Sequence, residues 1–169
     1  MNIELIVIGK TSEKYLKIGI QDYLSKISRF CSISINVLKS HTNKSLSTNE
    51  IIKLETKSIF QVIKPKDFLI CLDLNGKKIN SLELSKEIEN LTNIGKRDLK
   101  FLIGGPYGIS IDVKKRSNRM ISLSPMTFSH QLVRLIFLEQ LYRSFSILNN
   151  FPYHKYIWKN SWLWGKGYK

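Results

Sequence analysis

Hydrophobic residues alternate along the chain between short apolar runs, which fit buried strands, and stripes with helical spacing, which fit half-covered helices. The predicted strands lie at residues 3–8, 33–37, 68–72, 99–103 and 120–123. The predicted helices lie at about 12–27, 47–63, 81–91, 111–119 and from about 130 onward. Strand and helix alternate, which predicts an α/β fold with a mostly parallel sheet and helices on both faces.

Polar residues at the ends of these segments indicate where the elements begin and end. Ser47 and Glu50 have the spacing of a capping box, and Ser81 and Asp112 are predicted to cap the next two helices. The dipeptide Asn75-Gly76 is typical of a turn that follows the 68–72 strand.

The last helix has an unusually broad apolar face between Leu132 and Phe145. Its width exceeds what packing against one sheet requires. We therefore expect this helix to pack on its own subunit and on a second copy of the chain.

Charge and composition narrow the class of partner. The net charge of +14 favours a polyanion such as RNA, although the chain has no alanine and is rich in Lys, Ile, Asn and Ser, so part of the charge reflects composition. No apolar run is long enough to span a bilayer, and no secretory signal precedes the first strand, so we expect a cytoplasmic protein without membrane contact. Cys31 and Cys71 are expected to be buried thiols in a reducing compartment.

Two loops carry the candidate chemistry. Gly104, Gly105 and Gly108 follow a buried strand and leave backbone groups uncovered, so a flat ligand could approach them closely. An ordinary tight turn is the alternative; a phosphate loop is disfavoured because no Gly-Lys-Ser/Thr follows. The second loop, residues 124–129, leads directly into the last helix. Together the two loops predict a cofactor cleft.

These motifs resemble one family. The segments Leu-Ile-Gly-Gly-Pro-x-Gly, Ser-Leu-Ser-x-Met-Thr-x-x-His, Glu-Gln-Leu-Tyr-Arg and Pro-Tyr-His are similar to those of the ribosomal large-subunit methyltransferase H proteins, which belong to the SPOUT class. The resemblance covers about residues 1–154. It implies a SPOUT domain over 1–155, with a trefoil knot formed around residues 102–150, followed by an aromatic and basic extension over 156–169.

The resemblance also implies an activity. A homodimer would transfer a methyl group from S-adenosyl-L-methionine to N3 of a pseudouridine in 23S rRNA, within the assembled ribosome or large subunit. The donor arrives already activated, so no metal is required. Two other classes stay open: a SPOUT methyltransferase that acts on tRNA, and a non-catalytic, ribosome-associated RNA-binding module.

Site residues follow from the same motifs. The residues implied for the cofactor are Leu72, Gly105, Ser124, Pro125, Met126, Thr127, Phe128 and Ser129. The residues implied for RNA are His130, Arg134, Arg143 and Tyr153. The residues implied for catalysis are Tyr153, His154 and Arg143.

Several of these roles have alternatives. Arg143 could instead form an ion pair with Glu139 at i, i+4, and His130 could be structural. The base that deprotonates the imide is undetermined, with His154 and Asp73 as candidates. The 156–169 extension could bind RNA, pack on a second subunit or have no role.

Overall fold

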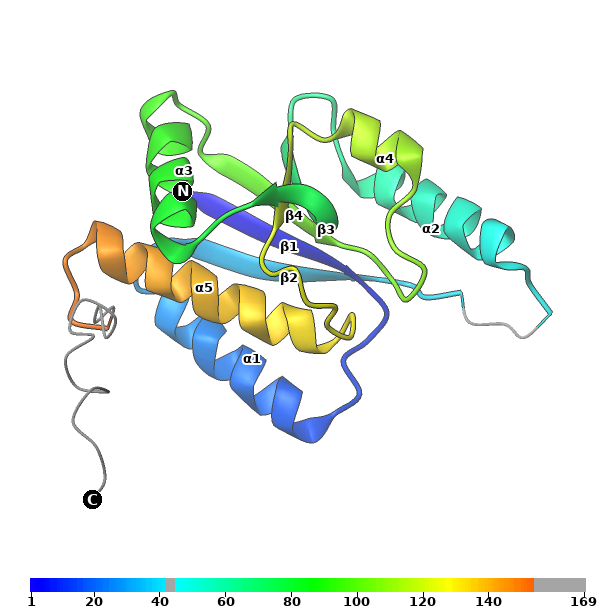
Figure 1. Ribbon diagram of the computed structural model, residues 1–169, viewed down its shortest axis with the longest axis horizontal. Helices are drawn as coiled ribbons and strands as arrows, with labels where there is room; N and C mark the ends of the chain where they lie inside the picture. Colours follow the sequence, from blue (N-terminus) through cyan, green and yellow to red (C-terminus); the bar gives the residue numbers. More distant parts are fainter. Residues whose placement is uncertain (42–44, 154–169) are drawn as a thin grey trace, which may run out of the picture.

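The computed structural model describes residues 1–41 and 45–153 and consists of one parallel sheet between two helical layers (Figure 1). The strands are β1 (Asn2–Ile8), β2 (Ser32–Leu38), β3 (Phe68–Lys78), β4 (Asp98–Ile103) and β5 (Arg119–Ser122). They pair in the order β2-β1-β4-β3-β5, and all neighbours are parallel. The predicted α/β class is confirmed.

Helices cover both faces of the sheet, as predicted. The helices are α1 (Lys14–Ile27), α2 (Thr48–Val62), α3 (Ser81–Asn93), α4 (Ile111–Arg116) and α5 (Leu132–Leu148). Side chains of α1, α3 and α5 share one core with Leu5, Phe101 and Ile70, whereas those of α2 and α4 share a second core with Ile6 and Leu102. Alternate residues of β1 and β4 therefore point into opposite cores, as the pleat of a strand requires.

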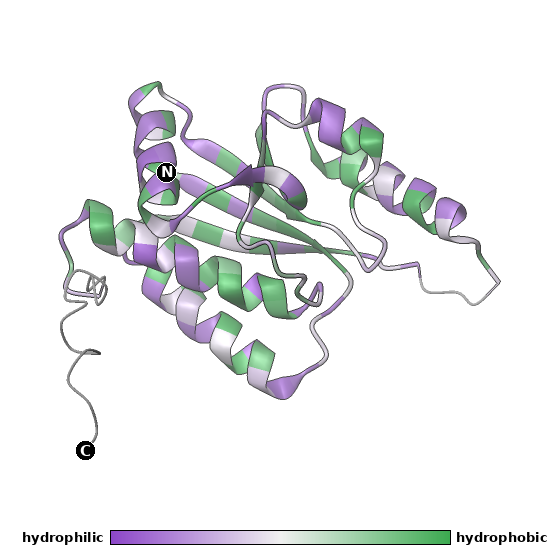
Figure 2. Ribbon diagram, viewed as in Figure 1, coloured by the Kyte–Doolittle hydropathy of each residue, from purple (hydrophilic) through white to green (hydrophobic). Residues whose placement is uncertain are grey.

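Most residues of the central strands β1 and β4 are buried, and α5 is apolar along most of its length (Figure 2). In the edge strand β2, Ile33, Ile35 and Val37 alternate with polar residues, a pattern that predicts one covered face. Ile33 and Ile35 pack against the core shared with α1, but Val37 is 47% exposed. The prediction of one covered face is thus wrong at Val37.

Caps define most helix starts. The capping box of Ser47 and Glu50 is confirmed: the Glu50 amide donates to Ser47 Oγ at 3.3 Å, and the Ser47 amide donates to the Glu50 carboxylate at 2.8 Å. The other two predicted caps are wrong by one and two residues. Asn80 caps α3 in a capping box with Glu83, and Ser110 caps α4, because their side chains lie just before the first helical residue.

The sequence predicts a turn at Asn75-Gly76. This prediction is wrong, because both residues are part of β3. β3 pairs with β5 through Leu72 and resumes at Lys77, with both residues opposite Ile121, so residues 73–76 bulge out of the ladder. A Cβ at Gly76 would lie 2.6 Å from the backbone of Ile121, so only glycine fits this close approach.

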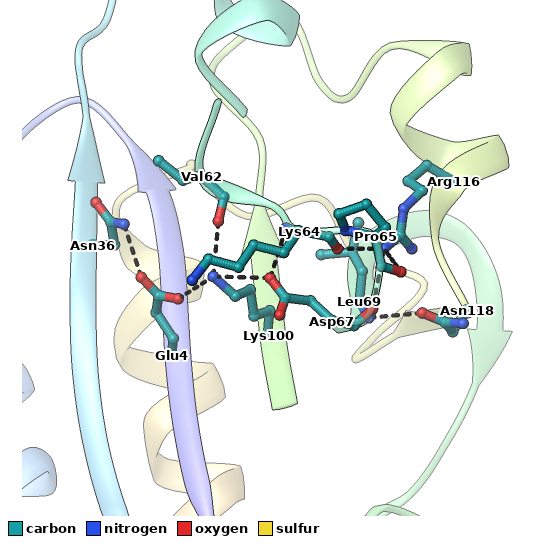
Figure 3. A network of polar contacts seen from close by, with 10 residues as sticks. All are labelled: Glu4, Asn36, Val62, Lys64, Pro65, Asp67, Leu69, Lys100, Arg116 and Asn118. Atoms are coloured by element: carbon teal, nitrogen blue, oxygen red, sulfur yellow. Dashed lines mark hydrogen bonds and ion pairs between the residues drawn. The ribbon is translucent and has the colours of Figure 1, made fainter. Parts of the chain in front are cut away.

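A polar network joins the strands at the amino end of the sheet (Figure 3). The Lys100 ammonium lies 2.6 Å from Glu4 Oε2 and 3.2 Å from Asp67 Oδ2, and it donates to the Val62 carbonyl. Burial opposes ionisation of Asp67, but the Lys64 amide and Lys100 outweigh it, so the pKa of Asp67 lies below its ordinary value. This network holds the framework at the end of the sheet opposite the strands' carboxyl termini.

Two further expectations bear on the class of protein. Cys31 and Cys71 are buried free thiols, and burial raises the pKa of each to about 11, which makes them unreactive. Among the described residues, none of the helices combines the length and apolar character needed to cross a bilayer.

Candidate functional site

A cavity of about 460 Å³ opens at the carboxyl ends of β3, β4 and β5. Its walls are the β3 bulge, the glycine turn after β4, the loop after β5 and the start of α5. Open parallel sheets place ligands at this edge, and the volume suits a nucleoside-sized molecule. The two loops singled out by sequence therefore face one cavity.

Seven of the eight predicted cofactor residues line this cavity: Leu72, Gly105, Ser124, Met126, Thr127, Phe128 and Ser129. Pro125 belongs to the same loop but is not part of the lining. Leu72, Ile103, Ile109, Ile121 and Val133 supply apolar surface that sequence reasoning identified only in part. An adenine ring could lie between such side chains while backbone groups bond to its edge.

Serine hydroxyls shape the 124–129 loop. Ser124 Oγ accepts the Met126 amide at 2.9 Å, and Ser122 Oγ donates to the Ser124 carbonyl at 3.0 Å. Ser129 Oγ accepts the amide of Leu132, the first residue of α5, at 3.1 Å. Ser129 thus ties the end of the loop to the first residue of α5, although Gln131 occupies the N-cap position and its side chain makes no capping bond. The loop is held open beside the cavity, with Met126 69% exposed at its mouth.

Two glycines of the turn after β4, Gly104 and Gly105, have no room for a side chain. A Cβ at Gly104 would lie 2.8 Å from the backbone of Gly108, which itself has φ +82°. A Cβ at Gly105 would lie 2.9 Å from Oε2 and 3.0 Å from Oε1 of Glu55. The missing side chain of Gly105 therefore leaves room for a carboxyl group of α2, while its backbone lines the cavity.

Three ionisable side chains line the cavity. Lys114 Nζ lies 2.7 Å from Asp73 Oδ2, and Asp73 Oδ1 accepts the Asn75 amide at 3.0 Å, so the candidate base Asp73 already has two partners. His130 is the third. Burial, aided by the nearby Arg134 charge, lowers the pKa of His130, so its imidazole is neutral near pH 7 and can hydrogen-bond but brings no charge.

Arg134 lies inside the molecule rather than on a surface. Its side chain is 1% exposed and donates to the carbonyls of Ile8 at 2.6 Å, Gly9 at 2.9 Å and His130 at 3.0 Å, and to Thr11 Oγ1 at 2.9 Å. Burial lowers the pKa of this guanidinium to about 10. In this arrangement Arg134 joins the end of β1 to the start of α5 and offers no surface to a phosphate.

Arg143 and Tyr153 lie together at the other end of α5. Arg143 pairs with Glu139, the alternative that the sequence left open, and its guanidinium lies 4.8 Å from the centre of the Tyr153 ring. The Tyr153 hydroxyl lies 3.2 Å from both Glu139 and Tyr23. Burial, supported by these neighbours, raises the pKa of Tyr153, which keeps the phenol neutral.

These two residues are therefore separated from the cavity within one chain. The cavity contacts the first turn of α5, and a helix of 17 residues is about 25 Å long. His154 falls outside the described residues, as does the 156–169 extension. Among the described residues, a single subunit therefore does not bring Arg143 and Tyr153 to the predicted cofactor residues.

Glu55 is the residue that sequence reasoning missed. Its side chain is 3% exposed, and it occupies the middle of the buried stripe Ile51, Glu55, Ile59 on α2. The pattern that could have identified it is an acidic residue at i+4 in an apolar stripe with i, i+4, i+8 spacing.

Comparison with known proteins assigns the chain to a family. Residues 1–154 match the family model described as "Predicted SPOUT methyltransferase". The chain belongs to the SPOUT methyltransferase family. The resemblance noted from the sequence motifs is thereby confirmed, whereas the trefoil knot that it implies stays a prediction.

Two relatives support the assignment, and a solved structure supports the fold. The "Ribosomal RNA large subunit methyltransferase H" of Flavobacterium psychrophilum is 47% identical over 155 residues, which are 91% of this chain and 99% of the relative. The protein of the same name from Fusobacterium nucleatum is 46% identical over 156 residues, 92% of this chain and 100% of the relative. The crystal structure of a "Probable Methyltransferase" from Bordetella pertussis Tohama I covers 85% of this SPOUT methyltransferase and 95% of its own chain, with a TM-score of 0.52 at 10% identity. That structure supports the fold alone.

Proposed function

We propose that this SPOUT methyltransferase transfers a methyl group from S-adenosyl-L-methionine to N3 of a pseudouridine in 23S rRNA. The observation that carries the proposal is the cavity at the carboxyl ends of β3, β4 and β5. It is formed by the two loops that match the family's motifs, in a chain with relatives named as ribosomal RNA methyltransferases. Leu72, Gly105 and the 124–129 loop would hold the cofactor.

The residues of the cavity suit alignment of the donor rather than covalent catalysis. Transfer breaks the bond between sulfur and the methyl carbon and forms a bond from that carbon to the imide nitrogen, which must lose its proton. The protein therefore has to fix donor and acceptor in line and exclude water. Apolar residues such as Ile103 and Phe128 can exclude water, and His130 can accept or donate a hydrogen bond at the rim as a neutral imidazole.

We infer a homodimer, because Arg143 and Tyr153, two of the residues proposed for RNA binding and catalysis, lie at the opposite end of α5 from the cavity. Antiparallel packing of α5 across a two-fold axis would bring Arg143, Tyr153 and His154 of one subunit to the cofactor of the other. Apolar surface is available for such contact: Tyr15 and Ile18 of α1 are 64% and 61% exposed. They lie beside Gly19, where a Cβ would come within 2.9 Å of Leu135 on α5.

The ribosome is the proposed substrate particle, with the cytoplasm as its location. A net charge of +14 favours phosphate contacts, yet the described residues form a single sheet domain without a separate RNA-reading module. Such a small enzyme gains specificity most readily from a large, preformed rRNA surface. This consideration favours 23S rRNA over tRNA.

The cofactor site predicts the effect of replacing Phe128 by Asp. Phe128 lies half-buried in the cavity wall, so a carboxylate there removes apolar contact while leaving the cores unchanged. We expect the affinity for S-adenosylmethionine, measured by titration calorimetry, to fall at least about tenfold. Phe60→Asp is the matched control, since Phe60 is 42% exposed on α2 and does not line the cavity.

Two outcomes would count against this assignment. Equal cofactor affinity in folded Phe128→Asp and in wild type would remove the 124–129 loop from the site. RNA binding by wild type without any cofactor binding would instead favour the non-catalytic module.

A further inference from the structure

Glu55 has a buried carboxyl group that the proposed reaction does not yet use. It belongs to α2, and its side chain is 3% exposed. Within the described part of the chain, its Oε1 atom has no hydrogen-bond partner. Unpaired buried carboxyl oxygens are rare because burial removes water without replacing its hydrogen bonds, so a partner absent from the isolated chain is expected.

Glu55 lies next to Gly105, which lines the proposed cofactor cavity. Both of its carboxyl oxygens lie within about 3 Å of the point where a Cβ of Gly105 would stand. Gly105 also lines the cavity with its backbone. Gly105 therefore adjoins both this carboxyl group and the cavity of the proposed ligand, and any larger residue at 105 would displace the carboxyl group.

Among the described residues, no positively charged side chain is paired with Glu55. On α2 its neighbours one turn away are Ile51 and Ile59, and the glycine turn carries no titratable side chain except Tyr107. On α4, the Lys114 ammonium is paired with Asp73. Burial alone raises the pKa of Glu55, with no described charge acting on it. A cation placed in the cavity would find Glu55 available as its counter-charge.

We infer that Glu55 is the anion that makes the site prefer the positively charged methyl donor over the neutral-sulfur product, acting across the backbone of Gly105. This inference rests on the proposed function. When the methyl group leaves, the electron pair of the broken bond stays on sulfur, and the sulfonium charge disappears. An anion shielded from water attracts the donor through that charge and loses the attraction once product forms, so Glu55 favours exchange of product for donor.

The test compares three ligands by titration calorimetry on the full-length protein. S-adenosylmethionine carries a sulfonium, sinefungin carries an ammonium at the equivalent position, and S-adenosylhomocysteine carries a neutral sulfur. Glu55→Gln is expected to weaken binding of the first two about tenfold and to leave the third within about twofold. Glu89→Gln, an exposed acid on α3, should leave all three affinities unchanged.

Steady-state kinetics and proton release on donor binding provide two further tests. Neither would change in the expected way if Glu55 served only to stabilise the fold. Glu55→Gln should raise KM for the donor while leaving kcat nearly unchanged, because Glu55 contributes to binding rather than to alignment. In wild type, burial raises the pKa of Glu55 above its ordinary value, whereas a cation placed nearby favours the carboxylate. In a series of pH values, donor binding should therefore release protons over the range in which Glu55 titrates, seen by calorimetry in buffers of different ionisation heat, whereas binding of S-adenosylhomocysteine should not. This measurement needs no variant.

The outcomes separate this inference from the proposed function. Equal weakening of all three ligands in Glu55→Gln, or equal proton release with donor and product, would overturn the role of Glu55 alone. If wild type bound none of the three ligands, the proposed function itself would fail.

Discussion

Replacing Arg134 by Met is expected to lower the free energy of unfolding by about 3–5 kcal/mol. The substitution removes four hydrogen bonds and leaves the carbonyls of Ile8, Gly9 and His130 without their donor inside the protein. For a chain of this length the midpoint of thermal unfolding should fall by about 10 °C, measured by calorimetry or circular dichroism. Arg134→Lys should lie between, since lysine keeps the charge but cannot reach all four acceptors.

Arg119→Met is the matched control for Arg134→Met. Arg119 is the first residue of β5, but its side chain is 58% exposed and pairs with Glu87 at 3.3 Å. Exposed pairs of this kind contribute about 0–1 kcal/mol, so little change is expected. An Arg134→Met protein that unfolds like wild type but binds RNA more weakly would return Arg134 to the RNA surface and contradict its structural role.

Two homodimers with impaired activity are expected to regain activity when their subunits are combined in a mixed dimer. One partner carries Phe128→Asp, which damages the cofactor cavity, and the other carries Tyr153→Ala, which removes a ring proposed to stack on the target base. Stacking of a base on an aromatic ring contributes about 1–3 kcal/mol, so Tyr153→Ala should reduce turnover about tenfold or more with little change in cofactor affinity. His154→Ala should act in the same direction.

The mixed dimer decides whether the site spans two subunits. If the cavity of one subunit works with the far end of α5 from the other, each mixed dimer contains one intact site and one doubly damaged site. Mixed dimers isolated with two affinity tags should therefore show about half of the wild-type activity. A mixed dimer no more active than its parents would mean that the cavity and Tyr153 act within one chain, and a fully active wild-type monomer would exclude the shared site.

The sequence predicts the framework well where local patterns act alone. Apolar runs at 3–8 and 99–103 become β1 and β4, and the capping box at Ser47 opens α2, because both features depend on neighbours in sequence. Asn75-Gly76 was misread, since the same dipeptide serves a turn or a bulge. The difference lies in the close approach of Ile121, which is distant in sequence.

The site divides in the same way. The two loops were identifiable from their glycines and from their likeness to a family, and they do share one cavity. Arg134 and Glu55 were not readable, because the environment of each depends on contacts between segments far apart in sequence. Arg134 meets Ile8 across 126 residues, and Glu55 meets the turn at Gly105. The proposed arrangement of two subunits depends on contacts between chains, and the pattern of one chain does not specify those contacts.

The most direct test is methyl incorporation from labelled S-adenosylmethionine into purified ribosomes, large subunits, the free rRNA stem-loop and tRNA, followed by mass spectrometry of the nucleosides. We predict N3-methylated pseudouridine in 23S rRNA, formed much faster on ribosomes or large subunits than on the free stem-loop. The rate should fall steeply with salt as phosphate contacts are lost. Methylated tRNA with unmodified 23S rRNA, or no methylated RNA from a protein that binds the cofactor, would contradict the account.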